Sequence, residues 1–187
     1  MKKGIFFLLS FVLCSSCVVK GNLAGLYGYY SKTIAQKPEL FVMHLSEAEI
    51  CGLRNSSIPK IAIIKGADIR QCVVDEEDAI IYLWAPKCKS PFCIPINLAQ
   101  QQCTLRKATL FIVAEYYDFD KMDELYNTER PIFGIDVDYY RSNLTSKYVK
   151  RFISDLATKD IEPARFIRFH KGQIVGAGPT IQDLYKK

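Results

Sequence analysis

The sequence has little histidine and tryptophan, and it lacks the patterns that mark several common kinds of active site. Its 187 residues include 2 His and 1 Trp, and His44 lies far from His170 in the chain. No Ser/His/Asp arrangement, phosphate-binding glycine loop or EF-hand spacing is present. These absences give no support to a hydrolase of the serine type, a phosphate-binding loop protein or an EF-hand protein.

Long apolar runs and a strong net charge are also missing. The apolar run Gly4–Leu13 is about ten residues long, whereas a membrane-spanning helix needs about 20, and no second run is longer. The formal net charge of +5 includes Lys2 and Lys3 at the N-terminus, and the remaining positive charge is small and scattered. Nucleic acid is therefore not an expected partner.

The N-terminus has the order of features found in a signal peptide. Lys2 and Lys3 precede the apolar run, which ends in Leu13-Cys-Ser-Ser-Cys17. Small residues directly before a cysteine resemble the bacterial lipobox, which implies a signal peptide over residues 1–16 and a lipid on Cys17. The alternative is an ordinary secretory signal that is cut nearby. With the lipid, the chain would be anchored to a bacterial membrane and would face outside the cytoplasm.

Five cysteines remain after the signal segment and Cys17 are set aside. An odd number means that at least one cysteine is free or pairs outside the chain. Export favours disulfides over zinc binding, and no histidine lies near these cysteines, so no metal site is expected. Cys103 is expected either to be buried or to pair with Cys51 or Cys72. The five are Cys51, Cys72, Cys88, Cys93 and Cys103.

Strand-like and helix-like segments alternate along the rest of the chain. Strands are expected where the runs are β-branched or continuously apolar, and helices where apolar residues share one helical face. The expected strands are 61–64, 69–74, 79–84, 109–114, 131–136, 165–169 and 173–175. The expected helices are 94–107, 120–126, 147–157 and 180–185, with a short one after the capping box Ser46–Glu49. This order predicts an α/β domain with a mixed sheet flanked by helices.

Three segments, taken together, resemble the thioredoxin superfamily. Tyr82-Leu-Trp-Ala-Pro-Lys-Cys88 resembles the end of the central strand and the active-site loop of that superfamily. Ile161–Phe169 resembles the loop and strand that carry its cis-proline, with Pro163 in that place, and Lys171–Val175 resembles its hairpin. The resemblance covers about residues 60–187, and it implies a thioredoxin-like domain over 58–187, preceded by a tether and N-terminal extension over 17–57.

The resemblance also implies a function, thiol–disulfide exchange without a cofactor. Cys88 would attack, Cys93 would resolve the mixed disulfide, Trp84 would shield the site and Pro163 would help to present the substrate. The partners would be protein thiols or disulfides. A peroxidase of the same superfamily would instead need Arg165 or Arg168 in the pocket of the attacking cysteine.

The spacing of the two cysteines departs from the superfamily. The chain has Cys-x-x-x-x-Cys in place of Cys-x-x-Cys, and two cysteines five residues apart on one helix would point about 140° apart. Part of 89–92 is therefore expected to be loop. The next helix would begin either at Pro91, capped by Ser90, or at Pro95. The alternative function is a non-catalytic thioredoxin-fold binding or scaffold lipoprotein, with Cys88 and Cys93 in a structural disulfide.

Overall fold

A mixed sheet of seven strands forms the centre of the protein in a computed structural model that describes residues 25–158 and 161–186. The strand order is β1-β2-β5-β4-β3-β6-β7. Strands β1, β2, β5, β4 and β3 are parallel, β6 is antiparallel to β3, and β7 is antiparallel to β6. The bounds are β1 Phe41–Val42, β2 Ile61–Ile64, β3 Asp78–Trp84, β4 Thr109–Ala114, β5 Ile132–Ile135, β6 Phe166–His170 and β7 Gln173–Gly178.

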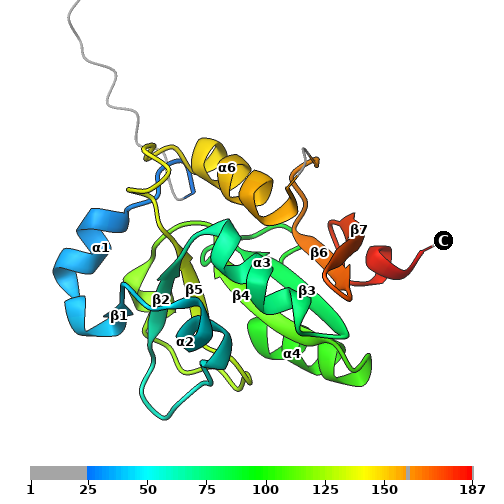
Figure 1. Cartoon of the computed structure of the whole chain (residues 1–187). Coiled ribbons are helices and arrows are strands. Elements are labelled where there is room, and N and C mark those ends of the chain that lie inside the picture. Colours follow the sequence, from blue (N-terminus) through cyan, green and yellow to red (C-terminus); the bar gives the residue numbers. More distant parts are fainter. Residues whose placement is uncertain (1–24, 159–160, 187) are drawn as a thin grey trace, which may run out of the picture.

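Six α-helices and two 3-10 helices accompany the sheet in the described part of the chain. Figure 1 shows α6 along the top of the molecule and α4 along the bottom, with the central strands between them. The predicted α/β class with a mixed sheet and flanking helices is therefore confirmed. The helices are α1 Tyr30–Gln36, η2 Pro38–Leu40, α2 Glu47–Gly52, α3 Gly66–Val74, α4 Ile96–Leu105, α5 Phe119–Met122, α6 Thr145–Ala157 and η3 Gln182–Tyr185.

The continuous apolar run of β3 explains its central place. Side chains of a strand alternate between the two faces of a sheet, so a strand without polar residues fits where both faces are covered. Ile80, Ile81 and Tyr82 are fully buried, and β3 pairs with β4 on one side and with β6 on the other. The carboxyl ends of β3 and β4 and the amino end of β6 therefore lie at the same end of the sheet's strands.

The expected strand at 69–74 is wrong, because this segment belongs to helix α3. Ile69, Cys72 and Val73 are buried, a spacing of three and four that places them on one helical face, whereas Val74 is exposed. The Lys65 amide donates a hydrogen bond to the Asp68 carboxylate at the start of the helix, with an N–O distance of 2.8 Å. Three other helices are shorter or tighter than expected: α4 covers 96–105, α5 covers 119–122 and the last one is the 3-10 helix η3.

The cysteines form two disulfides and leave one thiol unpaired among the described residues. Cys51 at the end of α2 is bonded to Cys72 in α3, and Cys88 is bonded to Cys93. Cys103 is free and fully buried in α4, so the first of its two expected states is confirmed. Burial raises the pKa of its thiol to about 12, which keeps it protonated and unreactive.

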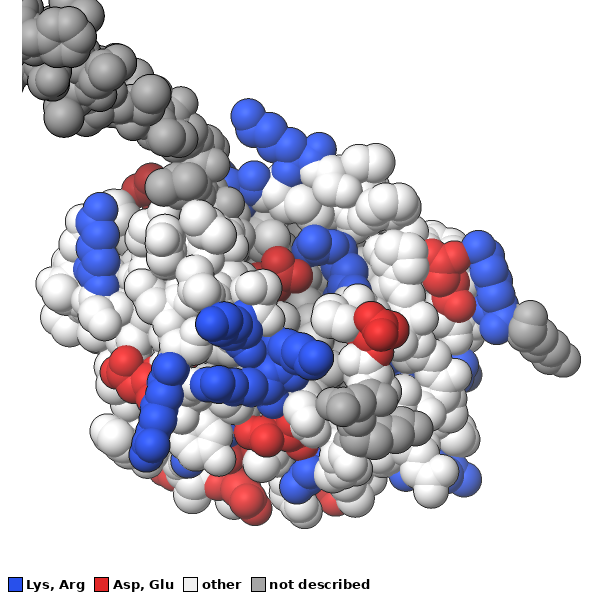
Figure 2. Space-filling view, turned by 90° about the horizontal axis from the view of Figure 1, so that it is seen from above, with Lys and Arg blue, Asp and Glu red and all other residues white. Residues whose placement is uncertain are grey.

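The described part of the N-terminal extension is folded onto the sheet. Strand β1 pairs with β2 at the sheet edge, and Leu40 and Phe41 are buried. Helix α2 begins with the predicted capping box, in which the Ser46 amide donates to the Glu49 carboxylate at 2.8 Å and the Ser46 hydroxyl accepts from the Glu49 amide. The predicted signal peptide 1–16 and Cys17 lie outside the described residues. Figure 2 shows the molecule from above, with several Lys and Arg side chains exposed on this side.

Candidate functional site

The Cys88–Cys93 disulfide lies in the loop that joins β3 to α4. The Cα atoms of the two cysteines are 6.0 Å apart. The loop makes two turns, because the Cys88 amide donates to the Ala85 carbonyl and the Cys93 amide donates to the Ser90 carbonyl, each at 3.0 Å. The prediction that part of 89–92 is loop is confirmed, since none of these residues is helical. Helix α4 begins only at Ile96, with Pro95 as its N-cap, so the expected start at Pro91 is wrong and Pro95 directly precedes the helix.

This loop is accessible from solvent. Both cysteines are half-buried, and Lys87, Lys89 and Phe92 around them are exposed. The Lys87 amide donates to the Tyr116 hydroxyl at 2.8 Å, and the Lys87 ammonium forms an ion pair with Asp118. The hydrogen bond with Asp118 raises the pKa of Lys87, so this amine stays charged. The positive charge beside Cys88 is therefore partly neutralised by Asp118, while Lys89 forms no ion pair within the described residues.

A pocket of about 550 Å³ connects this loop to the segment before β6. Its lining includes Ser90 and Phe92, which lie between the two cysteines, and also Glu162, Pro163 and Ala164. Neither Cys88 nor Cys93 is among the lining residues. The structure thus places Pro163 beside the Cys88–Cys93 loop, although no peptide bond in the described residues is cis, so the expected cis bond before Pro163 is wrong.

Comparisons of the chain with protein-family models, with curated proteins and with solved structures find no match. A function for this protein therefore has to follow from the chemistry of its own site.

Glu115 brings a poorly hydrated carboxylate to the same pocket. It follows β4 directly, its side chain is 21% exposed, and its amide donates to the Trp84 carbonyl at 2.7 Å. Arg165 lies 3.6 Å from the Glu115 carboxylate and donates to the Leu83 carbonyl at 3.1 Å. Burial raises the pKa of Glu115, and Arg165 partly opposes that rise. No sequence motif indicates this residue, although its position directly after β4, a buried strand parallel to β3, places it at the same end of the strands as the Cys88–Cys93 loop.

The raised pKa of Glu115 predicts a pH-dependent effect of the Glu115→Gln substitution on stability. A carboxyl group with a raised pKa in the folded state contributes stability at low pH that is lost as the pH rises through its folded pKa. Glutamine does not ionise and does not lose this contribution. The free energy of unfolding of the variant, relative to that of the wild type, is therefore expected to increase as the pH rises above about 4, the ordinary pKa range of a Glu carboxyl, as measured by urea denaturation. A difference that stays constant or falls as the pH rises would contradict the assigned burial.

Trp84 and Arg168 lie outside the pocket. Trp84 is buried and its ring packs edge-on against Tyr126 at 5.8 Å, whereas the neighbouring Leu83 lines the pocket. Arg168 pairs with Asp78 at 2.8 Å, at the other end of β3. Arg165 is therefore the one of the two candidate arginines that lines the pocket, and its guanidinium is already bonded to Leu83.

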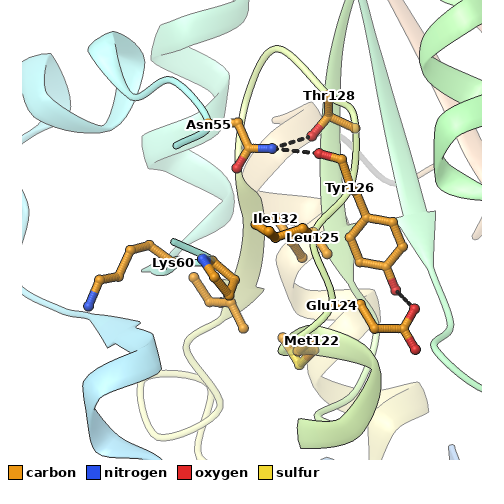
Figure 3. Close-up of a pocket in the computed structure, with 10 residues that line it drawn as sticks. Asn55, Lys60, Met122, Glu124, Leu125, Tyr126, Thr128 and Ile132 are labelled. Atoms are coloured by element: carbon orange, nitrogen blue, oxygen red, sulfur yellow. Dashed lines mark hydrogen bonds between the residues drawn. The ribbon is translucent and has the colours of Figure 1, made fainter. Parts of the chain in front are cut away.

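A second hollow, shown in Figure 3, is too small for an organic ligand. Asn55, Lys60, Tyr126 and Thr128 are among its lining residues, and its volume of about 10 Å³ holds about one water molecule. The Asn55 amide closes one side by donating to the Tyr126 carbonyl at 2.7 Å. Within 25–158 and 161–186 no group of three His, Cys, Asp or Glu residues is arranged to hold a metal ion, and no helix is long and apolar enough to cross a bilayer.

Proposed function

We propose that the protein is a thioredoxin-like thiol–disulfide oxidoreductase that is anchored to a bacterial membrane through a lipid on Cys17 and acts outside the cytoplasm. The observation that carries this proposal is the half-exposed Cys88–Cys93 disulfide, whose loop residues Ser90 and Phe92 line a pocket of about 550 Å³. A second disulfide, Cys51–Cys72, supports the proposed oxidising compartment.

The proposed reaction transfers two electrons between the cysteine pair and a substrate disulfide. In the reduced protein the Cys88 thiolate attacks a substrate sulfur, the substrate S–S bond breaks, and one substrate thiolate leaves. The Cys93 thiolate then attacks the Cys88 sulfur, which forms the Cys88–Cys93 bond and releases the second substrate thiolate. The reverse sequence oxidises a substrate dithiol. An external thiol or disulfide must restore the starting state of the pair.

The arrangement around β3 supports the thioredoxin-like interpretation. Because β6 is antiparallel to β3, the segment that precedes β6 lies where β3 ends. Pro163 and Ala164 therefore line the same pocket as Ser90 and Phe92 of the disulfide loop. The exposed residues Glu162 and Pro163 offer a surface on which an extended substrate chain would lie near the Cys88–Cys93 loop.

One observation favours the alternative of a binding or scaffold protein with a structural disulfide. A helix N-terminus stabilises a thiolate when the cysteine lies at the first turn. Cys93 lies three residues before Ile96, where α4 begins, and Cys88 lies further away. The pair therefore receives less help from the helix dipole than a cysteine in the first turn would.

The reduction potential of each disulfide distinguishes the two functions. We expect the Cys88–Cys93 pair to have a potential between about −270 and about −120 mV, the range of catalytic pairs, and Cys51–Cys72 to lie below about −300 mV. The measurement is equilibration of the full chain in thiol buffers, followed by alkylation and mass spectrometry of each cysteine. A value below about −300 mV for both disulfides would contradict the proposed exchange and support the structural alternative.

A further inference from the structure

The outward side of α6 carries an exposed group of cations. Lys147, Lys150 and Arg151 are exposed, and they follow the helical spacing of three and four residues. Arg141, shortly before the helix, is also exposed. Tyr148, on the opposite side of α6, is fully buried. These four residues, Arg141, Lys147, Lys150 and Arg151, are called the α6 basic surface below.

The charges of this surface are not neutralised by carboxylates in the described part of the chain. The ion pairs of the structure involve other residues, and the Arg151 guanidinium donates to the Tyr140 backbone carbonyl. Lys147 and Lys150 are exposed residues of α6. The α6 basic surface is therefore available to a partner that carries negative charge.

The chain enters the described structure directly beside this surface. The Thr145 amide donates to the Leu26 carbonyl at 3.1 Å, and the Gly28 amide donates to the Asn143 carbonyl at 2.9 Å. Tyr27 forms an isolated antiparallel bridge with Leu144. Residues 26–28 are thus fixed against the segment that begins α6.

Two exposed apolar side chains accompany the cations. Leu26 is 48% exposed and Tyr27 is 37% exposed, although both are held by backbone bonds to the start of α6. A tyrosine ring has an apolar body and a polar end, and such residues are enriched at the interface between membrane and water. Cations together with exposed apolar groups are the combination that an anionic phospholipid surface binds.

The distance from the proposed anchor to this face is short. Gly25 lies eight residues after Cys17, so a fully extended chain between them spans at most about 29 Å. Resting on the proposed lipid on Cys17, we infer that the α6 basic surface, with Leu26 and Tyr27, lies against a membrane leaflet that contains anionic phospholipid. Each cation held close to such a leaflet strengthens binding by about fivefold. The lipid and the α6 basic surface together give the domain one orientation on the membrane.

The experiment measures how fast lysine amines are modified on the lipid-bearing full protein reconstituted into vesicles. One set of vesicles contains phosphatidylcholine alone, and the other contains about 30% phosphatidylglycerol. Lys107 and Lys171 are exposed internal controls. Lys107 precedes β4 and Lys171 lies in the β6–β7 turn, so both are at the opposite end of the strands from the start of α6. We expect Lys147 and Lys150 to react about fivefold more slowly in the anionic vesicles, and the controls to react equally in both.

A charge reversal provides the matched variant. Lys150→Glu is expected to restore fast modification of Lys147 in anionic vesicles, whereas Lys107→Glu is expected to leave its protection intact. The inference would be overturned if all four lysines reacted at equal rates in anionic vesicles. It would also be overturned if Lys147 and Lys150 were protected in neutral vesicles as strongly as in anionic ones. Either result would count even if the protein carries its lipid. Mass spectrometry of the N-terminal peptide tests the anchor separately. An unmodified Cys17 would contradict the anchor, and with it the surface contact that depends on it.

Discussion

Cys88→Ala is expected to abolish exchange between the protein and a disulfide substrate, with a fall in rate of at least about 1,000-fold. Exchange requires a thiolate as the attacking group, and alanine supplies none. Cys93→Ala is expected to have a different effect, because the first attack by Cys88 needs no second cysteine. That variant should accumulate a mixed disulfide with the substrate and release it only slowly. The assay follows reduction of a disulfide-bonded peptide in the presence of excess dithiol.

Cys103→Ala is the matched control for these two variants. Cys103 is fully buried in α4 and forms no disulfide within the described residues. We expect its exchange rate to stay within about twofold of the wild type, since its protonated thiol takes no part in exchange. Undiminished exchange by Cys88→Ala would refute the mechanism. Exchange lost equally in all three variants would point to a folding defect, which circular dichroism of each variant detects.

The sequence predicts the central strands well, because their burial leaves a strong signal. β3 and β4 contain long apolar runs, which suit strands that are covered on both faces. The segment 69–74 is ambiguous because it lacks the long apolar run that makes β3 and β4 clear. It is short and contains β-branched residues, and a short apolar run does not distinguish a strand from a buried helix. The disulfide to Cys51 and the packing of α3 on α6 decide the outcome.

The candidate site is only partly visible in the sequence. Pro163, which the resemblance to the superfamily singles out, lines the same pocket as Ser90 and Phe92 of the disulfide loop, but its peptide bond is not cis. The resemblance does not indicate Glu115, which has no motif of its own and reaches the pocket only because β4 pairs in parallel with β3. Strand β1 cannot be predicted from the sequence either, because two residues are too few to show the alternation of apolar and polar residues. Both depend on contacts between segments far apart in the chain.

Gly66→Ala is expected to destabilise the protein by about 4 kcal/mol, because the backbone of α6 lies too close to Gly66 of α3 to admit a Cβ atom. A Cβ atom at Gly66 would lie 2.7 Å from the Leu156 amide nitrogen and closer still to the Phe152 carbonyl oxygen. Both are backbone atoms of α6, so no side-chain rotation relieves the overlap. The Gly66 amide also donates to the Tyr140 hydroxyl at 2.9 Å, which fixes the start of α3 in this position.

Gly52→Ala provides the opposite case with the same chemical change. Gly52 is the last residue of α2, and a Cβ atom there would have nothing within 4 Å. Alanine restricts the unfolded chain and favours the helix, so this variant is expected to be more stable than the wild type by about 0.5 kcal/mol. Urea denaturation measures both changes. Since the two substitutions add the same methyl group, a difference of several kcal/mol between them would isolate the contact of α3 with α6. If both variants stayed within about 1 kcal/mol of the wild type, α6 would have to move aside at Gly66, which would contradict the close packing.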